Sequence, residues 1–510
     1  MARVPALPMP ALARVPLPAL GSAMPAATVA LFLNSGGDER TRPDPLTGRS
    51  RYGTLGVPAE DEIWFSSSTA STVDPRSFAA AAEVLSRLVG TGAAGKSWDV
   101  KSWFDELRRR LIDLFAIPGA EAVLTPSGTE AEFAALGVAQ ALLSRPLTNI
   151  VVAPTETGRG VMMAAAGRHF LPSSSLGGLV AAGTPLRGFD RRPIETQGIA
   201  IRDEAGYPRD PEAIDREAAS LVAQALAAER DVLLHVLDAS KTGLSGVTRE
   251  TARALAKQAR GRIMIVVDAC QLRCQPAQLQ QDLESGFMVM VTGSKFAGGP
   301  PFAGALLLSP STVERLQGKA CAPAGLSAYS ARFDWPESLR TGFAAELESS
   351  VNLGLGLRWE AALAAIEPYF ALPEALRMQV LTWFAGAVHR RVTARPHLRQ
   401  VAAEPSRSKT IIPIETLGDA ATPAGAAALH AALAAPQAPS SAPAKLARAC
   451  HLGQPVLIGE RAALRICASM PMVLDIAARI AEGQKIEAAV APVVEDLDLV
   501  FEKWDRLAGA

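Results

Sequence analysis

The amino-acid sequence predicts an α/β protein with a mostly parallel central sheet flanked by helices and a smaller α+β domain at the C-terminal end. Short apolar runs alternate with helical segments between residues 120 and 310, which is the pattern of a parallel sheet with helical crossovers. After residue 350 the order changes to long helices followed by short strands. A hydrophobic content of 49% is sufficient for buried cores of this kind.

The predicted elements follow this order along the chain. Residues 76–117 predict two helices separated by a glycine-rich break. Short β-branched runs predict strands at 149–154, 232–239, 262–269, 287–293 and 304–309, and helical spacing predicts helices at 129–144, 211–229 and 248–260. The C-terminal part predicts helices at 352–370 and 375–392, strands at 409–416 and 463–469, an Ala-rich helix and a Pro/Ser loop within 419–446, and a last helix at 473–507.

We expect three regions in the chain. Residues 1–75 form a partly flexible N-terminal arm, because the first thirty residues contain repeated prolines that interrupt a helix. A targeting peptide is the alternative for this arm, although a signal sequence would contain one continuous apolar run. Residues 76–350 form the large α/β domain and residues 351–510 the small α+β domain.

Composition and charge exclude several classes of protein. The 51 Lys and Arg residues balance the 51 Asp and Glu residues, so the chain lacks the charge that nucleic acids or anionic membranes attract. Five cysteines in 510 residues suit a reducing compartment rather than a disulfide framework. No unbroken apolar run of about 18 residues predicts a membrane span. We expect a cytoplasmic protein without a nucleic-acid or membrane partner, and without a metal, because Cys270 and Cys274 lack further ligands nearby.

The first chemical signal is the segment TGSKFAGGPPFAG, residues 292–304. A predicted strand ends there, and Lys295 follows the small polar residue Ser294. An ammonium at the end of a buried strand is costly unless it is paired or converted to a neutral or delocalised group. A Schiff base to a carbonyl cofactor is one such use. The alternative is an ordinary exposed lysine.

The second signal is an acid at the end of the strand-like run IVVDACQ, residues 265–271. Asp268 follows three β-branched residues and needs a cation or a donor as its partner. The protonated nitrogen of a pyridine ring would serve, and Asp268 would then keep the ring an electron sink. Gln271 could reach a phenolic oxygen of the same ring. The alternatives are a helix-capping aspartate and a solvated glutamine.

The third signal is LTPSGTEAEFAAL, residues 124–136. Ser127, Gly128 and Thr129 open a predicted helix there, and the free N–H groups and hydroxyls of a helix start can bind a phosphate. Ser294 could add another hydroxyl to the same phosphate. The alternative is a plain helix cap.

The order of these three motifs resembles that of the fold type I pyridoxal-5′-phosphate (PLP) enzymes. The spacing of Asp268 and Gln271 is similar to that in the class V aminotransferase and cysteine desulfurase branch. The resemblance extends over residues 76–500 and implies a fold type I PLP transferase fold, PLP as cofactor and a homodimer. It implies that Lys295 forms the Schiff base, Asp268 binds the pyridine nitrogen and Gln271 approaches the ring hydroxyl. The three residues that open the helix would hold the phosphate together with Ser294.

Two further residues follow from the resemblance. Arg465 stands in an apolar strand, where a guanidinium suits bidentate capture of a carboxylate. It would hold the α-carboxylate of an amino-acid substrate; the alternative is an exposed edge-strand arginine. Many relatives stack an aromatic or His side chain on the ring, but this chain has Thr157 at that place. His169 lies further along a predicted helix and is interpreted as structural.

The segment LDASKTGLSG ends another predicted strand. Asp238, Ser240 or Thr242 could hydrogen-bond the ring hydroxyl or the substrate. Lys241 is a rival of Lys295 for the Schiff base. We rank it second because it precedes Asp268 in the chain, whereas the lysine of the family follows its aspartate. The polar stretch at residues 65–71 could close over the site.

We therefore expect a PLP-dependent enzyme acting on an amino acid, with aminotransferase favoured as the commonest outcome of these parts. A lyase shares the first steps. A cysteine desulfurase would use Cys450, 15 residues before Arg465, but the preceding AKLARA predicts a helical context and inert packing. The remaining alternative is a non-catalytic binding module that keeps the fold, and the presence of both Lys295 and Asp268 opposes it.

Overall fold

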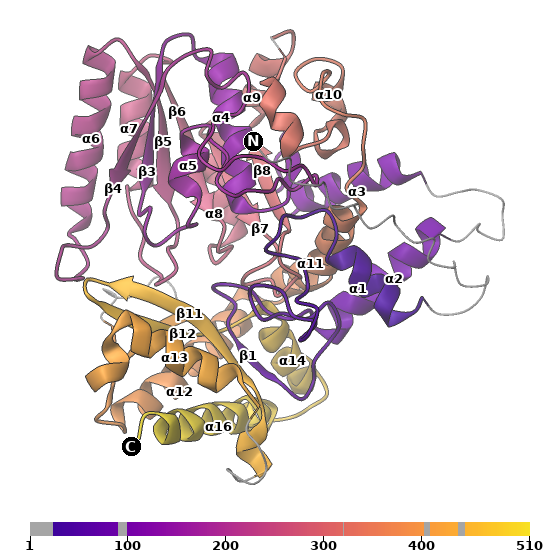
Figure 1. The fold of residues 1–510 in the computed structure, drawn as a ribbon, viewed down its shortest axis with the longest axis vertical. Coiled ribbons are helices and arrows are strands. Elements are labelled where there is room, and N and C mark those ends of the chain that lie inside the picture. Colours follow the sequence, from indigo (N-terminus) through magenta and orange to yellow (C-terminus); the bar gives the residue numbers. More distant parts are fainter. Residues whose placement is uncertain (1–23, 90–98, 320, 402–408, 437–443, 510) are drawn as a thin grey trace, which may run out of the picture.

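The computed structural model describes residues 24–89, 99–319, 321–401, 409–436 and 444–509, and Figure 1 shows their arrangement. Three predicted features lie wholly or largely outside these residues: most of the proline-rich arm, the glycine-rich break before residue 99 and the Pro/Ser loop. The described chain forms a seven-stranded sheet and a five-stranded sheet. Within this part of the chain, no helix is both long and apolar enough to cross a membrane.

The seven-stranded sheet has the order β2-β8-β7-β6-β5-β3-β4. Only β8 runs antiparallel to its neighbours, so the carboxyl ends of the other six strands meet at one edge. The strands are β2 (Glu121–Thr125), β3 (Leu147–Val152), β4 (Ile194–Ile199), β5 (Asp231–Leu237), β6 (Ile263–Ala269), β7 (Met288–Thr292) and β8 (Gly304–Leu308). The five predicted strands of this region are confirmed, whereas β2 and β4 were not predicted.

Both faces of this sheet are covered. Along β6, Ile265 and Val267 belong to one hydrophobic cluster and Met264 and Val266 to another, as the alternation of side chains in a strand requires. The long helices α4, α6 and α7 confirm the three helices predicted between the strands, and Figure 1 places α6 and α7 at the outer side. The flanking helices are α4 (Gly128–Leu142), α5 (Val161–Ala165), α6 (Pro211–Ala227), α7 (Arg249–Gln258), α8 (Pro276–Glu284) and α9 (Pro310–Leu316).

The five-stranded sheet has the order β1-β11-β12-β10-β9. Its first strand comes from the segment predicted as an arm, since Trp64 pairs with His451 and the two rings stack at 3.7 Å. The strands are β1 (Ile63–Phe65), β9 (Leu398–Gln400), β10 (Ile411–Thr416), β11 (Cys450–Ile458) and β12 (Arg461–Cys467). Cys450 therefore begins a strand and does not lie in the predicted helical context, because the preceding residues 444–447 form only a single 3-10 turn.

The remaining helices surround this sheet and join the two halves. They are α1 (Ala26–Leu33), α2 (Pro75–Val89), α3 (Val100–Asp113), α10 (Glu337–Arg340), α11 (Leu353–Ala371), α12 (Glu374–Thr393), α13 (Pro423–Ala434), α14 (Met470–Ala481), α15 (Ile486–Ala489) and α16 (Ala491–Leu507). The prediction of one last helix over 473–507 was wrong. Gly483 adopts a φ of +90° after α14, and Pro492 stands in the first turn of α16, so the segment divides into three helices.

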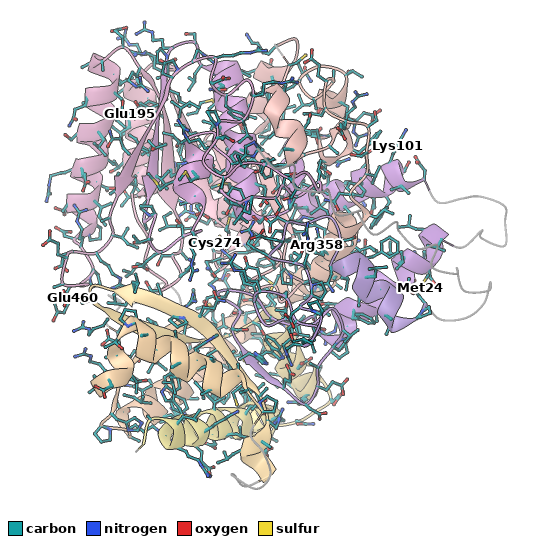
Figure 2. The ribbon with its side chains drawn as sticks, viewed as in Figure 1. Met24, Lys101, Glu195, Cys274, Arg358 and Glu460 are labelled. Atoms are coloured by element: carbon teal, nitrogen blue, oxygen red, sulfur yellow. The ribbon has the colours of Figure 1, made fainter. Side chains whose placement is uncertain are left out.

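A buried arginine ties the N-terminal segment to the large sheet. Arg358 of α11, labelled in Figure 2, is completely buried and donates hydrogen bonds to four main-chain carbonyls. One belongs to Phe302, just before β8, and the others to residues 33, 35 and 36. Since these carbonyls satisfy the charged group, Arg358 has a structural role.

Candidate active site

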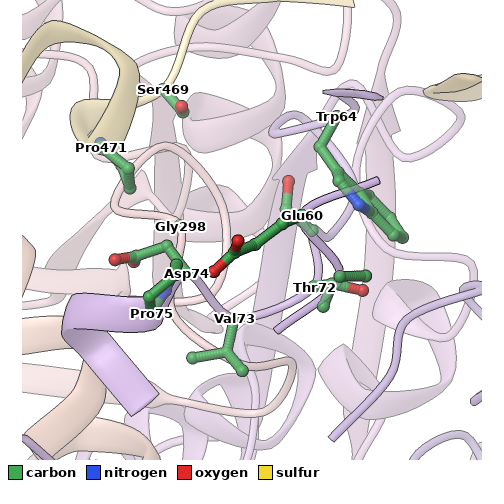
Figure 3. Close-up of a pocket in the computed structure, with 11 residues that line it drawn as sticks. Glu60, Trp64, Thr72, Val73, Asp74, Pro75, Gly298, Ser469 and Pro471 are labelled. Atoms are coloured by element: carbon green, nitrogen blue, oxygen red, sulfur yellow. The ribbon is translucent and has the colours of Figure 1, made fainter. Parts of the chain in front are cut away.

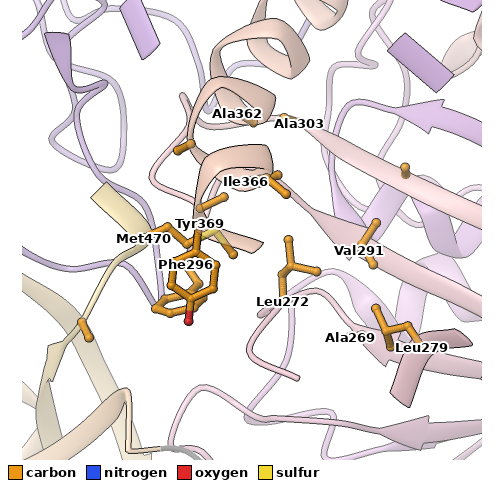
Figure 4. Close-up of a cluster of buried hydrophobic side chains, with 14 of the residues drawn as sticks. Ala269, Leu272, Leu279, Val291, Phe296, Ala303, Ala362, Ile366, Tyr369 and Met470 are labelled. Carbon is orange, nitrogen blue, oxygen red and sulfur yellow. The ribbon is translucent and has the colours of Figure 1, made fainter. Parts of the chain in front are cut away.

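Close packing against α11 fixes the loop that carries Lys295. A Cβ atom on Gly293 would lie 2.4 Å from the Cβ of Ala362, so only glycine lets the loop approach the helix. The N–H of Gly299 donates to the carbonyl of Gly293 at 3.0 Å, and the N–H of Gly298 donates to the carbonyl of Lys295 at 2.9 Å. Figure 4 shows the neighbouring Phe296 in the hydrophobic cluster beside the loop. The amine of Lys295 is thus carried on a rigid turn at the carboxyl end of β7.

Asp268 lies one strand away, at the same edge of the sheet. It is opposite Met290 in the β6–β7 register, and its Oδ1 accepts the N–H of Cys270 at 3.1 Å. Within the described chain its carboxylate forms no ion pair, and it is only partly buried. The thiol of Cys270 is close enough to both groups for the charges of Asp268 and Lys295 to act on it. The acid and the amine therefore share one site.

A buried polar network lies next to Asp268. The Nε2 of His235 in β5 donates to the Oδ1 of Asn149 at 3.1 Å and approaches the Glu132 carboxylate at 3.3 Å. Burial opposes protonation of His235, but the charges of Glu132 and Asp268 raise its pKa on balance. Asn149 also donates to Glu132 at 2.7 Å. The network therefore places the charged pair of His235 and Glu132 close to Asp268.

The N-terminus of α4 reaches the same edge. Ser127 is the N-cap, and its hydroxyl accepts the N–H of Thr129 at 3.2 Å. A Cβ atom on Gly128 would lie 2.5 Å from the Sγ of Cys270, so the helix start is pressed against the end of β6. A Cβ atom on Gly158, in the loop after β3, would lie 2.9 Å from the Oγ1 of Thr129. Gly128 therefore lets the helix start pack closely against Cys270, and Gly158 lets the loop after β3 approach Thr129.

This helix start offers donors to an anion. The hydroxyls of Thr129 and Ser294 make no hydrogen bond to other described residues, and the first N–H groups of a helix lack intrahelical partners. Glu130 follows in the first turn, fully buried, where burial raises its pKa. It accepts hydrogen bonds from Ser127 and Ser175 and pairs with Arg40 at 3.4 Å. These partners satisfy the Glu130 carboxylate. It therefore does not occupy the hydroxyls of Thr129 and Ser294, which remain available to an anion.

Gln271 faces a hydroxyl-rich segment, residues 66–72. Its Nε2 donates to the carbonyl of Ser68 at 3.1 Å, and its Oε1 accepts from Arg273 at 3.3 Å. Arg273 in turn donates to Ser67 at 3.0 Å and stacks over Phe296. The segment after β1 therefore lies against the site, in agreement with its predicted position there.

Arg465 of β12 is 1% exposed and forms no ion pair with a described carboxylate. Its Nη2 donates to Thr69 at 2.9 Å, its Nη1 to the carbonyl of Lys241 at 3.3 Å, and its Nε to the carbonyl of Gln454 at 3.1 Å. The alternative of an exposed edge-strand arginine is wrong, because β12 lies between β11 and β10. Burial lowers the pKa of Arg465, and its described partners are carbonyls and a hydroxyl, so no carboxylate neutralises the guanidinium.

Lys241 is the second amine of the site. Lys241 follows β5, and its main-chain N–H donates to the carbonyl of Glu156 at 3.0 Å. Burial lowers the pKa of the Lys241 ammonium to about 7, and three nearby positive charges add to this effect. Those charges belong to Arg465, Lys295 and Arg159. The charge of Lys295 acts on Lys241, so the two candidate lysines belong to the same region.

Two other predicted residues have local partners. The hydroxyl of Thr157 donates to the carbonyl of Ala153 at 3.1 Å, within the turn after β3. The carboxylate of Asp238 pairs with Arg249 at 3.0 Å, and the same arginine pairs with Asp282. Asp238 is thus already engaged by a cation on α7, which leaves it a weaker candidate than the sequence suggested.

Cys450, the candidate nucleophile, and His169, interpreted as structural, each have local partners. Cys450 is completely buried, and its thiol contacts the carbonyl of Arg448 at 3.6 Å. Burial raises the pKa of Cys450 to about 11, the opposite of what a nucleophilic thiolate requires. His169 follows α5 rather than lying within a helix, and its Nδ1 contacts the Tyr329 hydroxyl at 2.8 Å.

The pocket in Figure 3 is a separate feature. It has a volume of about 160 Å³ and is lined mainly by residues 59–75, with Gly298 and Pro471 on the opposite side. Ligand pockets usually have volumes of roughly 300 Å³ or more. Its walls include neither Lys295 nor Arg465, so we do not assign the chemistry to it.

The sequence did not identify several residues that the structure places here. Glu156, which directly precedes Thr157, is buried and pairs with Arg202 at 2.5 Å. Arg273 and Thr69 are polar residues without a motif of their own. The alternation of small hydroxyl residues at 66–72 was the only available signal, and it named a segment rather than a residue.

The chain matches no family model, and no curated protein resembles it in sequence. Solved structures resemble it in fold. The cysteine desulfurase CsdA from Escherichia coli has a TM-score of 0.53 at 15% identity, over 88% of this chain and 95% of that one. The cystine C–S lyase C-DES, in complex with cysteine persulfide, has a TM-score of 0.55 at 14% identity, over 88% and 98%.

A phosphoserine aminotransferase from Cytophaga hutchinsonii has a TM-score of 0.50 at 13% identity, over 86% of this chain and 99% of that one. These likenesses confirm the predicted fold, which is that of the fold type I PLP enzymes. They also support the resemblance to the branch that includes class V aminotransferases and cysteine desulfurases.

Proposed function

We propose that this chain is a PLP-dependent enzyme that acts on an amino acid, as an aminotransferase. The observation that carries the proposal is the meeting of Lys295, Asp268 and the N-terminus of α4 at one edge of the sheet. Ligands of parallel α/β sheets bind outside the carboxyl ends of the strands. Two proteins that share the fold are named for amino-acid substrates: the cystine C–S lyase and the phosphoserine aminotransferase.

The residues present fit this cofactor. A Cβ atom at Gly158 would lie 2.9 Å from the Oγ1 of Thr129, so this glycine keeps space free beside a hydroxyl of the helix start, where a phosphate would lie. The hydroxyls of Thr129 and Ser294 and the first N–H groups of α4 would bind that phosphate. Asp268 would bind the ring nitrogen and Lys295 would hold the carbonyl carbon. When bound, the cofactor supplies an electron sink for negative charge at the substrate Cα.

Each side chain would then have a defined task. Arg465 would bind the α-carboxylate of the substrate. The carboxylate would replace the carbonyl of Lys241 as a partner of Arg465, because this 3.3 Å hydrogen bond is the longest that the guanidinium makes. Lys295 would remove the proton from the substrate Cα, as a base must lie close to that proton. Gln271 and Thr69 border this space and would help to exclude water. Ser127 would keep the helix start in place through Thr129.

Cys450 bears on the choice between transamination and cleavage of a C–S bond. Its burial and its raised pKa oppose a persulfide-carrying role. A cysteine desulfurase would need a reactive cysteine, and Cys450 does not supply one. This favours the aminotransferase over the desulfurase. Elimination without a cysteine nucleophile uses the same proton removal and is separated from transamination by its products.

The absorption spectrum of the purified protein tests the proposal. We expect a visible band that borohydride bleaches, and Lys295→Ala should lack it. Lys257→Ala is the matched control, because Lys257 is exposed on α7. An amino-acid screen should then yield a keto acid without release of ammonia or sulfide. A protein that takes up no added PLP would contradict the enzyme and leave a binding module with this fold.

A further inference from the structure

The candidate site has an excess of positive charge. The ammonium of Lys241 is close enough to Arg465, Lys295 and Arg159 for each to disfavour its charge. These groups come from four separate segments: the loop after β5, strand β12, the loop after β7 and the loop after β3. Arg159 is exposed, whereas Arg465 is buried. The positive charge therefore extends from the interior to the surface.

The nearest carboxylate does not neutralise Lys241. Glu156 favours its charged form, but the carboxylate pairs with Arg202 at 2.5 Å and accepts a hydrogen bond from Ser240 at 2.8 Å. Thr242 donates to the same carboxylate. Within the described residues, the Lys241 ammonium has no hydrogen bond and no ion pair. A partly buried cation without a partner is costly, unless a ligand supplies the opposite charge.

The proposed function accounts for two of the cations and leaves one. Lys295 would hold the cofactor and Arg465 would bind the substrate α-carboxylate. We propose that Lys241 binds a second acidic group of the substrate, which makes amino acids with an acidic side chain the substrate class. The inference rests on the proposed function for the position of the α-carboxylate. Arg159, at the exposed end, would attract these negatively charged amino acids to the site.

The main chain supports this arrangement. The carbonyl of Lys241 accepts a hydrogen bond from the Nη1 of Arg465 at 3.3 Å, so the two cations are held on adjacent segments. The N–H of Lys241 is fixed by the Glu156 carbonyl at 3.0 Å. Arg465 is thus bonded to the main chain of Lys241, and the two side chains would bind the two acidic ends of one small molecule. A single carboxylate would leave one of them uncompensated.

Binding of simple dicarboxylates tests the inference without turnover. Succinate and its monoamide, succinamate, have nearly the same shape but differ by one negative charge. Isothermal titration calorimetry of both, with PLP-loaded and PLP-free protein, measures the preference. We expect succinate to bind at least about tenfold more tightly, and this ratio should fall close to one in Lys241→Met. Lys241→Arg keeps the charge and should keep a preference.

Lys257→Met is the matched control, since it removes a lysine charge from the exposed surface of α7. It should leave the succinate preference unchanged. Equal binding of succinate and succinamate to the unmodified protein would overturn the inference, and so would a preference that persists in Lys241→Met. Because Lys241→Met removes a charge that burial disfavours, the variant should fold, which circular dichroism verifies.

The two proposals can fail separately. If the protein takes up PLP but shows no dicarboxylate preference, only the acidic substrate class is wrong. If it takes up no PLP but shows a preference that depends on Lys241, the anion site stands and the proposed enzyme is wrong. Titration of the PLP-loaded protein with L-aspartate against L-asparagine, followed by absorption, then repeats the comparison with complete amino acids.

Discussion

The carbonyl of Lys241 accepts a hydrogen bond from the Nη1 of Arg465 at 3.3 Å and thereby joins the two sheets of the molecule. Lys241 follows β5 of the seven-stranded sheet, and Arg465 belongs to β12 of the five-stranded sheet. The same arginine reaches Thr69, just after β1. The candidate site is thus built from both sheets, and a shift of one sheet against the other would separate Arg465 from Lys241.

Gly128→Ala should weaken cofactor binding. The new Cβ atom would lie 2.5 Å from the Sγ of Cys270, so the start of α4 must move away from the end of β6. We expect the Kd for PLP, from absorption titration, to rise at least about tenfold. A second change, Cys270→Ala, removes the sulfur and should restore most of the affinity. Gly342→Ala, at an open position, is the control; an unchanged Kd in Gly128→Ala would contradict the phosphate site.

Arg465→Lys should raise KM for the amino acid more than it lowers kcat. A lysine cannot offer two parallel N–H donors to a carboxylate, and we expect a loss of about 1–3 kcal/mol in binding, which is a rise of roughly 5- to 150-fold in KM. Steady-state kinetics measure both constants. Arg216→Lys on the exposed face of α6 is the control. A KM equal to that of the unmodified enzyme would show that another group binds the α-carboxylate.

The pH dependence of stability should reveal Lys241. Its pKa is about 7 in the folded protein against 10.5 ordinarily, so the unfolded chain binds more protons between these values. Stability therefore rises with pH from about 7 to about 10.5 and is lower below pH 7. The groups that face this ammonium are Arg465, Lys295, Arg159 and Glu156.

Lys241→Met should remove this contribution. Relative to the unmodified protein, we expect the variant to gain at least about 1 kcal/mol at pH 6.5, since a tenfold change in proton affinity corresponds to about 1.4 kcal/mol. The gain should shrink as the pH approaches 10. Urea unfolding at both pH values measures it. A gain that is independent of pH would mean that Lys241 keeps its ordinary pKa.

Cys450 should prove dispensable for turnover. Its thiol is buried and its pKa is raised to about 11, so Cys450→Ala should keep kcat while lowering stability by about 1 kcal/mol. Thiol-labelling in the native state should modify the exposed Cys321 first. Loss of sulfide release from L-cysteine in Cys450→Ala, with the fold intact, would instead support a desulfurase.

The sequence predicted those parts of the site that follow from strand ends. Asp268 and Lys295 close neighbouring buried strands, and parallel strands place their carboxyl ends together, so their proximity could be inferred. The position of Thr69 could not, because β1 joins β11 across nearly four hundred residues of sequence. The sequence could not predict the ion-pair partner of Asp238 either, because Arg249 belongs to a different element, helix α7.

The most direct test of the central claim is peptide mapping of the borohydride-reduced, PLP-loaded protein by mass spectrometry. We predict a phosphopyridoxyl adduct on Lys295, at near-unit stoichiometry, with Lys241 unmodified. Lys295→Ala should then carry no adduct at either position. An adduct on Lys241, or none on either lysine after saturation with PLP, would contradict the account.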